Sequence, residues 1–156
     1  MIRVEIANQQ RFLRLERRKV SATVRRVLRG EGVTDAEISI ACVDDAAIQM
    51  LNERFLRHQG PTDVITFPLS APGAPLVGEV VLSAETVKRV AGELDNDVER
   101  EVLLYVIHGL LHLCGYDDQT PAQRRQMRAR ERYYLPAANT SPQRRRSVRA
   151  PRNRRP

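Results

Sequence analysis

The sequence has few of the features that mark secreted or membrane proteins. It has only two cysteines, Cys42 and Cys114, too few for a disulfide framework, and each sits in an apolar stretch where a small buried thiol is expected. No apolar run approaches the ~20 residues needed to cross a bilayer. The N-terminus alternates apolar and polar residues, whereas a secretory signal has a basic segment, an apolar core and a cleavage site. We therefore expect a cytoplasmic protein in a reducing compartment.

Acidic residues are absent from residues 143–156, which carry seven arginines. These arginines account for the whole net charge of +7, because the other 19 basic residues balance the 19 acidic ones. Residues 138–156 also have too few apolar side chains to offset the entropy of ordering, so we expect one domain over residues 1–137 and a disordered tail. Such a tail either binds the phosphates of RNA or DNA or only adds solubility.

Hydrophobic periodicity predicts four strands interleaved with five helices. The expected strands are 2–7, 37–43, 64–68 and 78–83, and the expected helices are 12–28, 45–55, 84–94, 98–114 and 121–135. Four of these helices follow a residue suited to cap them, namely Asp44, Ser83, Asp97 and Thr120. The helix at 98–114 is apolar nearly all round, so we expect it to be central and buried. The order indicates an α+β domain with a small mixed four-stranded sheet packed with about five helices.

The segment HGLLHLCGYDD, residues 108–118, holds two of the three histidines of the chain. His108 and His112 are four residues apart on the predicted central helix, so they project from one face and can reach one ion. Gly115 ends the helix and turns the chain back past that face, which places Asp118 as a third ligand from another direction. Cys114 lies about 240° around the helix from His108 and should point elsewhere.

The same two histidines also fit a structural role, because a pair with this spacing on an apolar helix is often buried and hydrogen-bonded to its neighbours. Desolvation favours the metal: two imidazoles on a helix with almost no other polar face need partners, and one ion satisfies both. The residue after His108 is Gly109, whereas a zinc peptidase with an HExxH motif carries its general base there. The sequence therefore argues against a peptidase of that class.

Three ordered motifs resemble the YbeY family of metal-dependent endoribonucleases, also called ribosomal RNA maturation factors. HGLLHLCGYDD resembles the family signature HGxLHLxGYDH, and LNERFLRHQGPTDVITFP and GEVVLS resemble its LNxxYR…PTDVLSFP and GDIVIS segments. The similarity covers about residues 1–135 and leaves out the arginine-rich tail. It implies a single-metal endoribonuclease acting on ribosomal RNA, particularly the 3′ end of the small-subunit RNA, with the small ribosomal subunit as partner.

Two positions depart from the family pattern. The third metal histidine of the family falls on Asp118, so the implied ligands are His108, His112 and Asp118, a set that zinc accepts and that also suits iron or manganese. His58, in the loop before PTD, is an alternative third ligand, a phosphate contact or an exposed loop residue. The family's arginine after the LN motif falls on Leu56, and Arg57 follows one position later.

Cleavage of an RNA phosphodiester needs a cation for the developing charge and groups that move protons. We predict that Arg57 supplies the cation if the loop shifts it by one position; otherwise it faces solvent. Asp117 would orient a histidine or relay a proton, or else cap the helix break. Thr62 and Asp63 either line the same cleft or close the turn before the strand at 64–68.

Two rival functions fit the same residues. One is a ribosome-binding or RNA-binding factor that has lost catalysis and keeps a structural metal, and the other is a metallohydrolase acting on a different substrate. The altered third ligand and the displaced arginine motivate the first, and the second follows because a ligand set does not name its substrate. The sequence gives no indication of oligomeric state.

Overall fold

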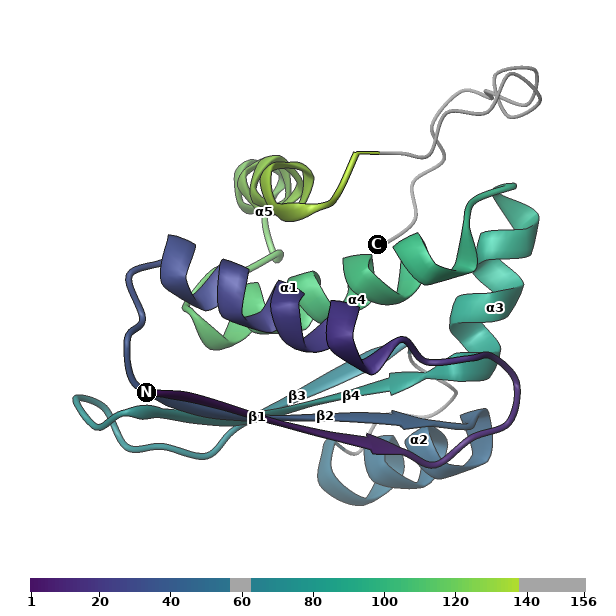
Figure 1. Ribbon diagram of the computed structural model, residues 1–156, viewed down its shortest axis with the longest axis horizontal. Coiled ribbons are helices and arrows are strands. Elements are labelled where there is room, and N and C mark those ends of the chain that lie inside the picture. The colour runs from purple at the N-terminus through teal and green to yellow at the C-terminus, as the bar shows by residue number, and fades with distance from the viewer. Residues whose placement is uncertain (57–62, 138–156) are drawn as a thin grey trace.

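The computed structural model describes residues 1–56 and 63–137 (Figure 1). The elements follow in the order β1 (Ile2–Asn8), α1 (Arg17–Gly30), β2 (Ala36–Val43), α2 (Asp45–Leu51), a π-helix (Asn52–Leu56), β3 (Val64–Pro68), β4 (Leu76–Ser83), α3 (Ala84–Glu93), α4 (Val98–Leu113) and α5 (Pro121–Tyr134). Within this part of the chain, five α-helices and one four-stranded sheet confirm the predicted α+β fold. Arg57, His58, Thr62 and the predicted tail at 138–156 lie outside the described residues.

The sheet is mixed, with the strand order β1-β2-β4-β3. β1 and β4 both run parallel to β2, and β3 runs antiparallel to β4 at one edge. α1 connects the parallel strands β1 and β2, which cannot be joined by a tight hairpin turn. In Figure 1, α1 and α4 cover one face of the sheet, α5 lies outside these two helices, and α2 lies on the opposite face. α4 is therefore enclosed between the sheet and other helices.

The four predicted N-caps are confirmed. The side chains of Asp44, Ser83 and Asp97 accept hydrogen bonds from the backbone N–H three residues later, at 2.8, 3.3 and 3.2 Å. Thr120 forms a complete capping box with Gln123, and Pro121 occupies the first helical position. Each cap satisfies backbone groups that the first turn of a helix leaves without an internal partner.

The first helix begins at Arg17, so the prediction that it starts at Phe12 is wrong. The cause is local, because the Oε1 atom of Gln10 accepts hydrogen bonds from the backbone N–H groups of Phe12 and Leu13 at 2.7 and 3.0 Å. A side chain that bonds nearby backbone groups offers the chain an alternative to helix. Phe12 is left 43% exposed instead of joining the buried stripe of α1.

The second helix also differs from its prediction. α2 ends at Leu51, and the chain continues through Asn52–Leu56 as a π-helix, whereas one α-helix was expected to reach Phe55. Phe55 is 56% exposed, and its ring packs edge-on against Phe67 of β3 at 5.8 Å between centroids. The wider turn therefore moves Phe55 out of the apolar face of α2 and beside the edge strand.

α4 is the buried centre of the domain, as predicted, with every residue from 101 to 111 buried. Gly109 lets it approach the sheet, because a Cβ atom there would lie 2.6 Å from Cγ1 of Val80 in β4 and 3.2 Å from Cγ2 of Thr66 in β3. The close approach packs α4 directly against β4 and the edge strand β3. Although α4 is apolar, none of the described helices is long and apolar enough to span a membrane.

α5 is fastened to α1 through Glu31. The Oε2 atom of Glu31 accepts hydrogen bonds from Tyr134 and Arg130 of α5, and its Oε1 atom accepts one from Tyr116 at 2.7 Å. Burial alone would raise the pKa of Glu31, but these three hydrogen bonds outweigh it and lower the pKa below its ordinary value. Burial and the bond to Glu31 raise the pKa of Tyr134 to about 12. One carboxylate thus joins α1, α5 and the turn after α4.

Candidate metal centre

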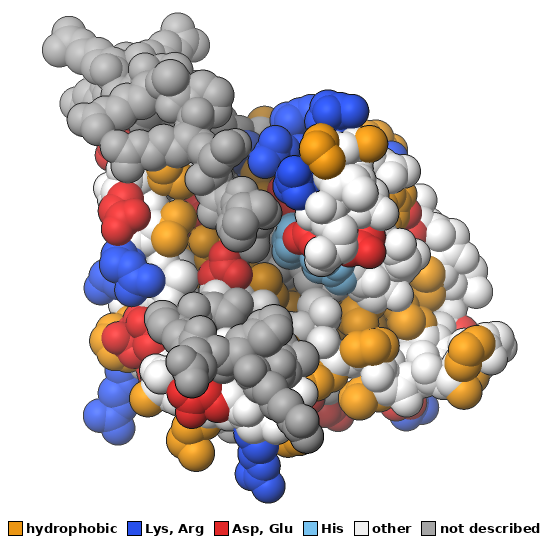
Figure 2. Space-filling model, turned by 180° about the vertical axis from the view of Figure 1, so that it is seen from behind, with side chains coloured by type: hydrophobic (Ala, Val, Ile, Leu, Met, Phe, Trp, Pro, Cys, Tyr) orange, Lys and Arg blue, Asp and Glu red, His pale blue; other side chains and the backbone are white. Residues whose placement is uncertain are grey.

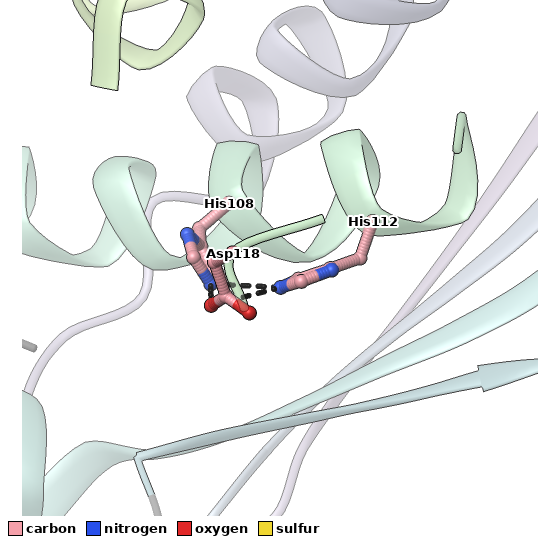
Figure 3. A group of neighbouring side chains, drawn as sticks. All are labelled: His108, His112 and Asp118. Atoms are coloured by element: carbon pink, nitrogen blue, oxygen red, sulfur yellow. Dashed lines mark hydrogen bonds and ion pairs between the residues drawn. The ribbon is translucent and has the colours of Figure 1, made fainter. Parts of the chain in front are cut away.

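His108 and His112 project from the same face of α4, one turn apart (Figure 3). Their Nε2 atoms lie 3.1 Å apart, and the rings stand nearly at right angles, at 81°. His108 is 3% exposed, whereas the side chain of His112 is 25% exposed. The pair therefore has one member fixed in the interior and one at the border with solvent.

Asp118 reaches this pair from the turn after α4. Gly115 adopts a φ of +103°, a conformation that glycine reaches without strain, and the backbone N–H of Tyr116 closes the turn on the carbonyl of Leu111 at 3.0 Å. The Oδ2 atom of Asp118 then lies 3.6 Å from Nε2 of His108 and 3.4 Å from Nε2 of His112 (Figure 3). The three side chains that the sequence singled out are brought together at one point.

The spacing of these donor atoms fits a metal ion. Ligands bonded to a tetrahedral zinc ion at about 2.0–2.2 Å lie about 3.4 Å from one another. The three observed separations, 3.1, 3.4 and 3.6 Å, bracket that value. Two imidazole nitrogens and one carboxylate oxygen are also ordinary metal donors, and Asp118 and His112 are each about one-quarter exposed, so an ion has access.

Glu131 of α5 stands behind His108. Its Oε2 atom lies 2.6 Å from Nδ1 of His108, and Glu131 is itself nearly buried. A carboxylate at this distance accepts a hydrogen bond from the Nδ1–H group. The proton of the neutral ring then stays on Nδ1, and the lone pair of Nε2 is directed at His112 and Asp118. This arrangement selects the tautomer that a metal ligand needs.

Glu131 was not predicted from the sequence, although its pattern contains a signal. Met127, Glu131 and Tyr134 are the buried residues of α5 and follow one another at helical spacing. Glu131 is therefore an acidic residue within the otherwise apolar stripe of an arginine-rich helix. A buried carboxylate needs a hydrogen-bonding or charged partner, so an acidic residue in this stripe indicates a polar partner in the core.

Asp117 is exposed and directly precedes the donor Asp118. Its Oδ1 atom accepts a hydrogen bond from the backbone N–H of Asp118 at 2.8 Å. The contact that orients His108 is made by Glu131 rather than by Asp117. The predicted role of Asp117 in proton relay stays a prediction. Asp63 directly precedes β3, and its backbone carbonyl accepts a hydrogen bond from the backbone N–H of Ser83 at 3.1 Å, which continues the pairing of β3 with β4 by one residue.

Cys114 is separate from the three donors. Cys114 is half-buried and Cys42 is fully buried, and both are free thiols. Burial first, and then the charge of Glu31, raises the pKa of Cys114 to about 11, so the thiol stays protonated at neutral pH. A protonated thiol is a poor metal ligand.

The surface around the donors is recessed and charged. Figure 2 shows the histidine side chains at a hollow, with acidic side chains beside them and a group of lysine and arginine side chains close by. α5 itself adjoins the donors, because its buried face supplies Glu131. A polyanion approaching the donors would meet positive charge at the rim.

Known proteins resemble this chain over most of its length. The family described as "Endoribonuclease YbeY" matches residues 5–139. A protein named endoribonuclease YbeY from Chloroherpeton thalassium is 38% identical over 79% of this chain and 86% of its own, and one from Syntrophotalea carbinolica is 36% identical over 82% and 90%. A third, from Rhodopirellula baltica, is 43% identical over 65% of this chain, which spans only about half, 53%, of that relative.

The fold also has a solved counterpart. A solution structure of a Thermotoga maritima protein superposes with a TM-score of 0.61 at 28% sequence identity, and the match covers 86% of this chain and 87% of the other. The fold and more than a quarter of the residues are therefore shared with this solved structure.

Proposed function

This chain belongs to the endoribonuclease YbeY family, and from that premise we propose that it is a metal-dependent endoribonuclease acting on single-stranded RNA during ribosomal RNA processing. The substrate we propose is the 3′ end of the small-subunit RNA, with the small ribosomal subunit as partner and the cytoplasm as location. The observation that supports metal dependence is the convergence of His108, His112 and Asp118, together with the hydrogen bond between Glu131 and Nδ1 of His108.

Three of these residues would act as metal ligands, and the fourth orients one of them. His108, His112 and Asp118 would ligate the ion. Glu131 accepts a hydrogen bond from Nδ1–H of His108, which keeps the proton on Nδ1 and leaves Nε2 free to bind the ion. A bound ion would polarise the scissile phosphate and stabilise the negative charge that develops on it. Two histidines and a carboxylate suit zinc, and the carboxylate also suits iron or manganese.

Two further residues are proposed to act on the substrate. Asp117 is exposed next to the ligand Asp118, where its carboxylate would accept or return a proton. Arg57, outside the described residues, would add a positive charge against the developing phosphorane. Both assignments carry over from the sequence and are proposals about catalysis rather than about metal binding.

A row of arginines on α5 supports RNA as the substrate. Arg125, Arg128 and Arg132 are exposed and follow at intervals of three and four residues, so they line one side of the helix. None of the three forms an ion pair with another described residue. We call these three residues the α5 arginine row and propose that it binds phosphates of the RNA strand that enters the centre.

The test combines metal content with cleavage. Purified wild type is compared with His112→Ala, Asp118→Ala and His58→Ala for metal content by mass spectrometry and for turnover of a small-subunit RNA precursor. We expect about one ion per chain, lost together with cleavage in the first two variants and retained in His58→Ala. Loss of metal in His58→Ala with retention in Asp118→Ala would move the third ligand to His58.

The rival functions give different results. A wild type that binds the RNA precursor and metal without cleaving it would indicate an RNA-binding factor with a structural metal. Cleavage of a peptide or ester instead of RNA by the same metal-loaded preparation would indicate a different hydrolase.

A further inference from the structure

The loop that carries Asp118 is tied to α5 by one arginine. Nη1 of Arg124 donates hydrogen bonds to the backbone carbonyls of Asp118, at 3.3 Å, and of Gln119, at 3.1 Å. One guanidinium therefore spans two successive peptide groups of the loop. Both bonds come from the one NH2 group at Nη1, which carries two N–H donors and can direct one to each carbonyl.

The remaining backbone groups of this loop are also bonded. Oε1 of Gln123 accepts from the backbone N–H groups of Gln119 and Thr120, both at 3.0 Å, and the N–H of Asp118 donates to Asp117. Together with the Arg124 contacts, these bonds occupy both backbone groups of Asp118 and Gln119. The loop is thus held as an extension of α5 rather than as a free connection.

Helix electrostatics do not explain a cation at this position. Arg124 is the fourth residue of α5, and the first turn of this helix contains no acidic residue. The positive end of the helix dipole lies there, so a nearby cation is mildly unfavourable. Arg124 is nevertheless half-buried against the loop, while its neighbour Arg125 is exposed. The loop carbonyls are what hold it.

Arg124 contacts the backbone of Asp118 and not its carboxylate, which therefore stays available to a metal ion. Among the described residues Arg124 forms no ion pair, whereas Oδ2 of Asp118 faces both histidines. An arginine bonded to that carboxylate would compete with an ion for its lone pairs.

From these contacts we propose that Arg124 is a positioning residue that fixes the backbone of Asp118 and so places the third ligand within reach of the ion. The inference rests on the metal centre proposed above. Arg124 acts through Asp118 and touches neither the ion nor the substrate. Removal of its guanidinium frees the peptide groups after Asp118, and the carboxylate then spends less time in the binding geometry.

The experiment measures zinc affinity by competition with a chelator, on the full chain, for wild type and Arg124→Gln. We expect Arg124→Gln to bind zinc about 10- to 100-fold more weakly, the usual effect of removing a group that orients a ligand. The absorption spectrum of the cobalt-substituted protein should also change, because the carboxylate is displaced. Arg124→Lys should recover part of the affinity, since one ammonium can still reach one carbonyl.

Arg125→Gln is the matched control for metal binding, because it removes the same charge from the adjacent, exposed position. Its zinc affinity should equal that of wild type. Thermal unfolding of the metal-free proteins separates positioning from folding: a merely structural arginine would lower the unfolding temperature and leave the zinc affinity of the folded protein unchanged. That result, or an equal loss of affinity in Arg125→Gln, would overturn the proposal.

A double substitution tests the route of the effect. An Asp118→Ala background, titrated with excess zinc, keeps only the weak binding of the two histidines, so adding Arg124→Gln should not weaken zinc binding further. A further loss of the same size would show that Arg124 acts elsewhere. A wild type that binds no zinc, iron or manganese would overturn the metal centre itself, whereas equal zinc affinity in wild type and Arg124→Gln overturns only the role of Arg124.

Discussion

Glu131 and His108 are separated by 23 residues in the chain, yet Oε2 of Glu131 lies 2.6 Å from Nδ1 of His108. The contact links two helices, since His108 belongs to the buried α4 and Glu131 to the outer α5. It makes α5 a part of the candidate metal centre although α5 supplies no ligand. The folding of α5 onto α4 and the metal affinity should therefore depend on each other.

Replacing Glu131 should weaken metal binding without removing a ligand. Glu131→Gln keeps the shape of the side chain but lacks the charge, so its amide oxygen forms a weaker hydrogen bond with Nδ1–H of His108. We expect zinc affinity to fall by about 10- to 100-fold, measured by chelator competition. Glu93→Gln, an exposed position at the end of α3, is the control. Equal affinities of Glu131→Gln and Glu93→Gln would show that the contact does not tune His108.

Stability should depend on pH through Glu31. Its pKa is lowered in the folded state, so the ionised form stabilises the fold fully above the ordinary pKa, and this contribution is lost as the pH falls from that value through the lowered pKa of the folded state. Glu31→Gln should cost about 1–3 kcal/mol at neutral pH, because it weakens three hydrogen bonds in a mostly buried network. Urea unfolding of both proteins at neutral pH and at about pH 3 should show the gap narrowing in acid. A gap that stays constant would contradict the assignment.

The close contact at Gly109 should tolerate no side chain. Gly109→Ala would push a methyl group to 2.6 Å from Cγ1 of Val80 and force α4 away from the sheet. Overpacking of this kind costs about 1–3 kcal/mol, which thermal or urea unfolding can measure.

Gly92→Ala in α3 is the matched control for Gly109→Ala. A Cβ atom added there has no neighbour within 4 Å among the atoms described, so alanine should stabilise the helix by about 0.5–1 kcal/mol. Destabilisation by Gly92→Ala as large as that of Gly109→Ala would mean that the effect is not one of packing against Val80.

The α5 arginine row should set part of the salt dependence of RNA binding. Replacing all three arginines with glutamine should make the slope of log affinity against log salt shallower by about 2, because each phosphate contact on a single strand contributes about 0.7. Binding of a labelled single-stranded RNA over a range of salt concentrations measures it. The triple variant Arg11→Gln, Arg14→Gln and Arg18→Gln removes the same charge from exposed positions before and at the start of α1 and should leave the slope nearly unchanged. An equal change in both triple variants would indicate net charge alone.

Much of this protein was determined by the sequence alone, because the deciding forces are local. Asp44, Ser83, Asp97 and Thr120 cap helices with their own side chains, so each helix start could be placed within the chain itself. The spacing of His108 and His112 fixes them on one face of a helix wherever that helix lies. Gly115 ends α4 and permits the turn that brings Asp118 back, again within a few residues.

Only the tertiary structure decided what supports those ligands. The buried carboxylate of Glu131, the Arg124 contacts with the loop and the Glu31 bonds to α5 all depend on how α5 packs against α4 and α1. No periodicity within α5 specifies which neighbour its buried face will meet, because helical spacing fixes which residues share a face but not the partner of that face. The sequence could name three candidate ligands, whereas their orientation is a property of the packed helices.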